Sequence, residues 1–159
     1  MGRSPGCQGR CYAGRLDCIV LARGGPLMSV LIVEDNPDVR DGLTRILTRS
    51  GFEVDHAENG LVALARLQQR AYDAVVCDIM MPVMDGIRLY ELLAHQYPEV
   101  ARRVLFVSAW FDDPDVGGFL ERTGQPVLRK PFDIEEFVRL VRDIAGATSL
   151  PSALKAGPA

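Results

Sequence analysis

Three short, uninterrupted apolar runs constrain the fold of this chain most, because each is rich in β-branched residues and much shorter than a buried helix. They are Val30–Val33, Ala74–Cys77 and Val104–Val107. Strands that are apolar on both faces belong inside a parallel sheet that helices cover on both sides. Phe52–Val54 and Val127–Leu128 are weaker runs, which is typical of strands at the edges of such a sheet.

Amphipathic helical patterns follow each predicted strand. Each begins with a residue suited to capping a helix, and the last has the spacing of a capping box between Asp133 and Glu136. Gly117 and Gly118 fall inside the fourth pattern and predict a short or mobile helix, because glycine weakens a helix interior. The alternation of strand and helix predicts a doubly wound α/β fold with a five-stranded parallel sheet. The helical patterns begin at or near Asn36, Asn59, Asp85, Asp115 and Asp133.

The two ends of the chain lack this pattern. Residues 1–27 hold four Arg, one acidic residue and six Gly, with no hydrophobic period. We expect them to be a disordered or non-native extension, with Met28 as the physiological start or residues 1–27 as a linker remnant. Residues 28–147 form the predicted domain, and residues 148–159 a flexible tail. The extension also holds Cys7, Cys11 and Cys18, a spacing without the fourth ligand that zinc sites favour.

The charge and hydropathy of the chain argue against several classes of function. The net charge of −3 gives no reason to expect binding to nucleic acid. No apolar run approaches the ~18–20 residues that cross a bilayer, so we expect no membrane span. The apolar stretch near the N-terminus is also too short for a secretion signal. These features predict a cytoplasmic domain.

The predicted strands end in residues that suit phosphoryl chemistry. Glu34 and Asp35 follow the first strand, Asp78 and Ser108 end the third and fourth, and Lys130 follows the fifth. In a parallel sheet these ends meet at one edge, where ligands bind. Two carboxylates ~5 Å apart repel by ~3 kcal/mol at an effective dielectric of ~20. Mg²⁺ relieves such repulsion, and a carboxylate beside Mg²⁺ and a lysine can act as a nucleophile toward phosphorus.

The motifs at these strand ends resemble the receiver domains of two-component response regulators. The resemblance covers about Ser29 to Ile144 and implies a flavodoxin-like (βα)5 fold with strand order 2-1-3-4-5. The order and position of the fragments make the signal specific, although each alone is weak. The matching fragments are Leu31–Asn36, Val76–Gly86, Phe106–Ala109 and Leu128–Phe132.

The resemblance also implies roles for the residues at the strand ends. Asp78 would accept a phosphoryl group from a histidine kinase or a histidine phosphotransfer protein. Glu34, Asp35, Asp78 and the backbone carbonyl of Met80 would hold Mg²⁺. Lys130 would pair with the phosphoryl group, and Ser108 would move to hydrogen-bond it. The peptide bond between Lys130 and Pro131 is expected to be cis.

The surface expected to signal to a downstream protein departs at one position from the pattern of related receivers. Receivers of transcription factors commonly carry Tyr or Phe three residues before the lysine, where this chain has Val127. The segment Glu121–Pro126 resembles receivers attached to hybrid histidine kinases. A downstream protein is expected to bind the face formed by the fourth helix, the fifth strand and the last helix.

We also expect Met80 and Trp110 to shield the phosphoryl group from water.

Two other classes of function share part of this pattern. A haloacid-dehalogenase-type phosphatase uses an aspartate nucleophile with Mg²⁺, but it needs a second aspartate where this chain has Met80. A pseudo-receiver acts only as a protein-binding module and does not need the complete acidic set. The favoured prediction is a phosphoacceptor that is not an enzyme, apart from slow loss of its own phosphoryl group.

Overall fold

The computed structural model describes residues 27–147 of the chain. The expectations for the N-terminal extension before Leu27, for its three cysteines and for the tail after Ala147 lie outside the described residues. Within residues 27–147, no helix is long and apolar enough to cross a membrane.

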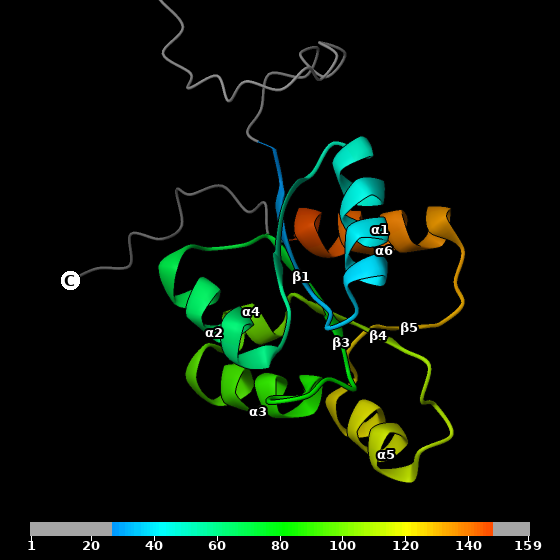
Figure 1. Cartoon of the computed structure of the whole chain (residues 1–159). Helices are drawn as coiled ribbons and strands as arrows, with labels where there is room; N and C mark the ends of the chain where they lie inside the picture. The colour runs from blue at the N-terminus through cyan, green and yellow to red at the C-terminus, as the bar shows by residue number, and fades with distance from the viewer. Residues whose placement is uncertain (1–26, 148–159) are drawn as a thin grey trace, which may run out of the picture.

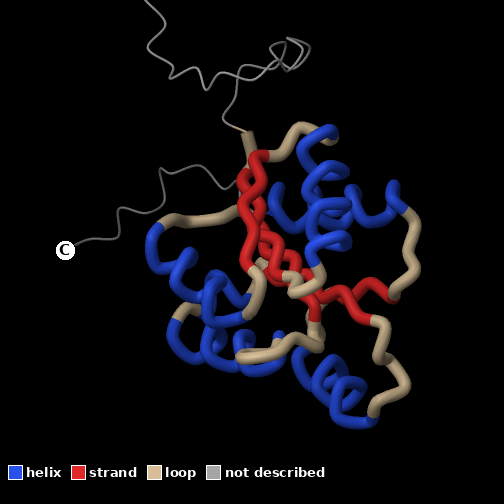
Figure 2. Tube along the Cα trace, viewed as in Figure 1, coloured by secondary structure: helices blue, strands red, loops and turns tan. Residues whose placement is uncertain are grey.

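Five parallel strands form one sheet in the order β2-β1-β3-β4-β5, which confirms the predicted doubly wound fold and its strand order. β1 pairs with β2 on one side and with β3 on the other, and β4 joins β3 to the short edge strand β5. Figure 2 shows the strands side by side through the middle of the domain. The strands are β1 (Ser29–Val33), β2 (Glu53–Ala57), β3 (Ala74–Asp78), β4 (Val104–Ser108) and β5 (Val127–Arg129).

Helices cover both faces of the sheet (Figure 1). α1 and α6 pack on one face, and α2, α3, α4 and α5 pack on the other. The helices are α1 (Pro37–Arg49), α2 (Gly60–Gln69), α3 (Gly86–Gln96), α4 (Pro98–Ala101), α5 (Pro114–Thr123) and α6 (Ile134–Ala147).

The central strand β1 shows why its apolar run is continuous. Val30 and Ile32 lie in the core beneath α1 and α6, whereas Leu31 and Val33 lie in the core on the opposite face. All four side chains are at most 1% exposed. Both faces of the strand are therefore buried, as the absence of alternation predicts.

The predicted helix starts are largely confirmed by capping hydrogen bonds. The Asn36 side chain accepts from the backbone N–H groups of Asp38 and Val39, and the Asn59 and Asp85 side chains cap α2 and α3 in the same way. Two elements differ from prediction. The short helix α4 was not predicted, so the fourth helix expected from the sequence is α5 in the structure. The strand β2 extends to Ala57, beyond the predicted end at Val54, although its residues alternate little in polarity. Neither difference moves the strand ends that carry the predicted site.

Candidate functional site

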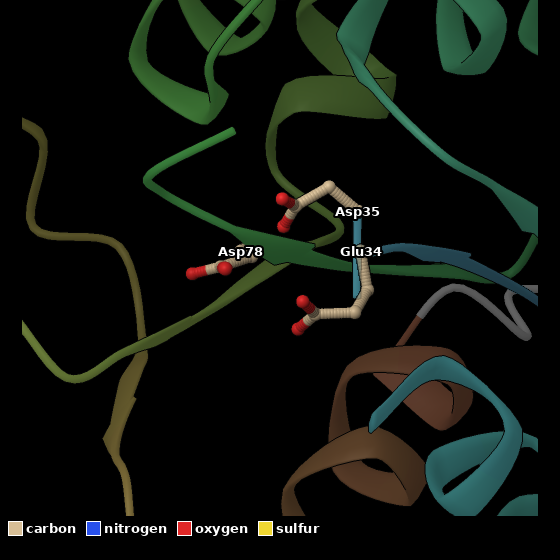
Figure 3. Close-up of side chains that lie close together, drawn as sticks. All are labelled: Glu34, Asp35 and Asp78. Carbon is tan, nitrogen blue, oxygen red and sulfur yellow. The ribbon is translucent and has the colours of Figure 1, made fainter. Parts of the chain in front are cut away.

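Three carboxylates meet where β1 and β3 end. Val33 pairs with Cys77 across these strands, so the residues that follow, Glu34 and Asp78, emerge side by side. Each of Glu34, Asp35 and Asp78 offers a carboxylate oxygen that lies within 4.8 Å of the others. Figure 3 shows the three carboxyl groups gathered at this edge of the sheet. The structure thus brings together the three acidic residues that the sequence singled out.

The three carboxylates differ in their surroundings. Glu34 is 3% exposed, and its Oε1 accepts a hydrogen bond of 3.2 Å from the backbone N–H of Asn36. The side chain of Asp78 is 11% exposed. Asp35 is exposed, and its carboxylate forms no hydrogen bond or ion pair with the residues that the structure describes. The cluster therefore has two held carboxylates and one that faces solvent.

Lys130 brings a positive charge to the cluster from the end of β5. Its Nζ lies 2.8 Å from Oε2 of Glu34 and 3.5 Å from Oδ2 of Asp78. The peptide bond to Pro131 is cis, as expected. Burial lowers the pKa of Lys130, but the hydrogen bond to Glu34 and the charge of Asp78 outweigh that effect and raise it overall. The ammonium group therefore stays charged beside the two buried carboxylates.

Asp78 is held in an environment that disfavours its charge. Burial raises the pKa of Asp78 from 3.8 to about 6, and the charge of Glu34 adds to this effect. Lys130 and the backbone N–H groups of Ile79 and Met80 act in the opposite direction. Because the net shift is upward, the ionised carboxylate gains from any additional positive charge placed beside it.

Ser108 ends β4, next to β3, and is fully buried. Its Oγ accepts a hydrogen bond of 3.0 Å from the backbone N–H of Trp110. Within the described part of the chain, no hydrogen bond joins Ser108 to Asp78. Ser108 therefore lies on the strand next to that of Asp78, and its hydroxyl oxygen is hydrogen-bonded to the backbone of the loop that follows β4.

The loop after Asp78 depends on close backbone packing. The backbone N–H of Gly86 donates to the carbonyl of Ile79 at 2.8 Å, and a Cβ at Gly86 would collide with the carbonyl oxygen of Asp78. Val83, at the tip of the loop, has a φ of 70° and is 80% exposed. The start of α3 thus packs directly against the residue that carries the carboxylate.

The two residues expected to shield the site lie on the loops that follow β3 and β4. Met80, in the loop after β3, is 47% exposed, and Trp110, in the loop after β4, is 58% exposed. Both are large apolar side chains open to solvent on loops that leave neighbouring strands. Their placement is compatible with shielding, which stays a prediction.

Sequence reasoning missed Arg40, whose guanidinium Nη1 donates to the backbone carbonyl oxygens of Glu34 at 2.9 Å and Asp35 at 3.4 Å. One signal was available. Arg40 is the fourth residue of α1, close to a helix end that disfavours cations, so a local acceptor could have been sought.

The acidic cluster fits a hard divalent cation. Such ions take oxygen ligands, and Mg²⁺ in proteins is usually held by one or two carboxylates and several waters. The exposed carboxylate of Asp35 leaves one side of the cluster open to solvent and to an incoming phosphoryl group. The residues present therefore fit the magnesium ion that the resemblance implies.

Most of the described residues match known proteins. The family model described as the response regulator receiver domain matches residues 30–142. The transcriptional activator protein IrlR of Burkholderia pseudomallei is 38% identical over 119 residues, which cover 74% of this chain and 50% of IrlR. The response regulator receiver protein CpdR of Brucella abortus is 31% identical over 112 residues, which cover 69% of this chain and 89% of CpdR. The chain thus spans about half the length of IrlR.

A solved receiver structure is similar to this chain in its fold. The receiver domain of the sensor histidine kinase PA1611 from Pseudomonas aeruginosa, which has a magnesium ion coordinated in its active site cleft, superposes with a TM-score of 0.68 at 26% identity. The alignment covers 76% of this chain and 99% of that domain. Since the family match runs from β1 into α6 and includes every residue of the acidic cluster, this chain belongs to the response regulator receiver domains.

Proposed function

We propose that the domain is the phosphoacceptor of a two-component phosphorelay and that Asp78 takes the phosphoryl group. The observation that carries the proposal is that carboxylate oxygens of Glu34, Asp35 and Asp78 lie within 4.8 Å of one another. Lys130 Nζ lies 3.5 Å from the Asp78 carboxylate. The phosphodonor is the phosphohistidine of a histidine kinase or of a histidine phosphotransfer protein. We place this exchange in the cytoplasm.

The chain has the ligands for Mg²⁺ at this position. The carboxylates of Glu34, Asp35 and Asp78 would hold the ion together with the backbone carbonyl of Met80. When bound, Mg²⁺ supplies positive charge that offsets the repulsion among the carboxylates and the charge of the transferring phosphoryl oxygens.

The transfer itself is a displacement at phosphorus. A carboxylate oxygen of Asp78 attacks the phosphorus, a P–O bond forms, and the P–N bond to the imidazole of the donor breaks. The imidazole leaves with the electron pair of that bond and takes up a proton from solvent. Lys130, which already lies beside Asp78, would neutralise one oxygen of the acquired phosphoryl group. The product is an aspartyl phosphate, which water hydrolyses slowly, so the domain is a signalling element and not an enzyme with turnover.

The response to phosphorylation begins at Ser108. Its hydroxyl would leave the backbone N–H of Trp110 and donate to a phosphoryl oxygen, which shifts the loop between β4 and α5. α5 contains Gly117 and Gly118 and begins four residues after Trp110 at Pro114, so it is the element best placed to respond.

The surface that signals onward is proposed to be the one formed by α5, β5 and α6, and its partner a downstream protein. Val127 occupies the β5 position where related receivers often have an aromatic ring, and it packs partly buried against the core beneath α5. A rotation of a large ring at this position is therefore not part of the proposal.

Incubation with a small phosphodonor, such as acetyl phosphate, tests the proposal directly. With Mg²⁺, the intact mass is expected to rise by one phosphoryl group in wild type and in Asp41→Asn, a control on the exposed surface of α1. Asp78→Asn is expected to show no rise. A mass gain that persists in D78N would contradict the assignment of Asp78, and no gain in any protein would favour a pseudo-receiver that only binds partners.

A further inference from the structure

The side chain of Arg40 contacts the backbone of the acidic cluster and not its carboxylates. Its Nη1 donates to the carbonyl oxygen of Glu34 at 2.9 Å and to that of Asp35 at 3.4 Å. No salt bridge joins Arg40 to a carboxylate among the described residues. The 2.9 Å bond has the length of a strong charge-assisted hydrogen bond, whereas the 3.4 Å contact is longer and weaker. The Glu34 carbonyl belongs to the peptide group that joins Glu34 to Asp35, so the shorter bond fixes the backbone between the two acidic residues.

The arrangement matters most for Asp35. Glu34 is already held through its carboxylate, by Lys130 at 2.8 Å and by the backbone N–H of Asn36 at 3.2 Å. The carboxylate of Asp35 is exposed and has no such partner in the described part of the chain. The position of that carboxylate therefore depends on the backbone to which it is attached, and Arg40 holds that backbone.

Two features indicate that Arg40 is kept in this position against local costs. Its Nε is buried and finds no hydrogen-bond partner within the described residues. The residue is also the fourth in α1, near the helix end where the macrodipole disfavours a positive charge. Arg45, further along the same helix, is exposed and shows neither feature.

The geometry points to Arg40 as a positioning residue that preorganises Glu34 and Asp35 for Mg²⁺ by clamping the backbone between β1 and α1. The inference rests on the proposed function, since it concerns the affinity of that same metal site. If Arg40 acted only through its charge, its loss would tighten Mg²⁺ binding, because a cation near the site repels Mg²⁺. Loss of the clamp changes the Mg²⁺ affinity in the opposite direction and weakens binding.

The test is a Mg²⁺ titration of the full chain, followed by the fluorescence of Trp110, the only tryptophan, and by the rise in melting temperature. The variants are Arg40→Gln, Arg40→Lys and the matched charge control Arg45→Gln. We expect R40Q to bind Mg²⁺ about tenfold more weakly, at the lower end of the loss caused by removing an outer-shell partner. R40K keeps the charge and can make part of the clamp, so it should bind with intermediate affinity. R45Q should bind as wild type does.

The possible outcomes distinguish a failure of the positioning role of Arg40 from a failure of the proposed function. If wild type binds Mg²⁺ and R40Q binds it equally well or more tightly, the positioning role is wrong while the proposed function stands. If wild type does not bind Mg²⁺, both are wrong. If R40Q does not fold, R40K decides: weaker binding than wild type supports the clamp, and equal binding overturns it.

Discussion

Replacement of Asp78 by Asn should make the metal-free domain more stable, although Asp78 is the residue on which the proposed function depends. The substitution keeps the shape of the side chain and removes a charge that the fold disfavours. Lys130 is not left unpaired, because Glu34 remains at 2.8 Å. The usual penalty for removing one partner of a buried ion pair therefore does not apply.

The size of the effect follows from the pKa of Asp78, which is raised from 3.8 to about 6 in the fold. At 1.36 kcal/mol per pH unit, the ionised carboxylate destabilises the folded state by about 3 kcal/mol when the pH is well above 6. Part of this gain is lost because an amide cannot match every contact of a carboxylate. We expect D78N to raise the free energy of unfolding by about 1–3 kcal/mol near pH 7.5.

The sign of the pH dependence provides an internal control. Because the pKa is higher in the folded state, the penalty is complete above about pH 6 and shrinks as the pH falls toward 4. Linkage predicts a maximum difference between D78N and wild type of about 1 kcal/mol near pH 4.5, against about 3 kcal/mol near pH 7.5. Asp41→Asn, which removes an exposed charge on α1, should change stability by less than about 0.5 kcal/mol.

Urea denaturation without Mg²⁺ at the two pH values measures both quantities. Addition of Mg²⁺ near pH 7.5 should stabilise wild type more than D78N, since the variant has lost one proposed ligand. If D78N is no more stable than wild type near pH 7.5, the account of a strained acidic cluster is refuted.

Three further substitutions test other parts of the structure. Gly86→Ala should destabilise the domain by about 3 kcal/mol or more in denaturation and also reduce phosphorylation, because its Cβ would collide with the backbone of Asp78; an unchanged midpoint would contradict that packing. Val83→Gly should raise the free energy of unfolding by about 1 kcal/mol by relieving a φ of 70° at an exposed β-branched residue, and a loss of stability would show that this conformation is not strained. Lys130→Met should lower the free energy of unfolding by about 3 kcal/mol because it leaves the buried carboxylate of Glu34 without its cation, and a neutral result would show that the pair is dispensable for stability.

Much of the fold could be predicted because its strongest signals are local. The continuous apolar run of β1 has only one consistent explanation, burial on both faces, and the structure shows both pairs of side chains in opposite cores. Helix starts at Asn36, Asn59 and Asp85 were readable from capping chemistry. α4 was missed because its four residues are too few to show a helical period. β2 was predicted too short because an exposed edge strand tolerates polar residues.

The members of the candidate site were predictable, but not their interactions. Parallel strands place the acidic residues at one edge whatever the details of packing, so the cluster followed from the topology. That Lys130 lies closer to Glu34 than to Asp78 depends on the path of the loop after β5. The hydrogen bond between Ser108 and Trp110 likewise depends on loop backbone geometry, which no spacing in the sequence encodes. For Arg40, the place of the residue in the first turns of α1 was a signal that its charge needs a local acceptor, but the acceptors themselves depend on the loop backbone.

The central claim is that phosphoryl transfer to this domain ends on the carboxylate of Asp78 and requires Mg²⁺. Borohydride reduction converts an aspartyl phosphate to homoserine, so peptide mapping after phosphorylation and reduction identifies the acceptor. Homoserine is expected at position 78 when Mg²⁺ is present, and none is expected when Mg²⁺ is chelated. Homoserine at another aspartate, or equal labelling without Mg²⁺, would contradict it.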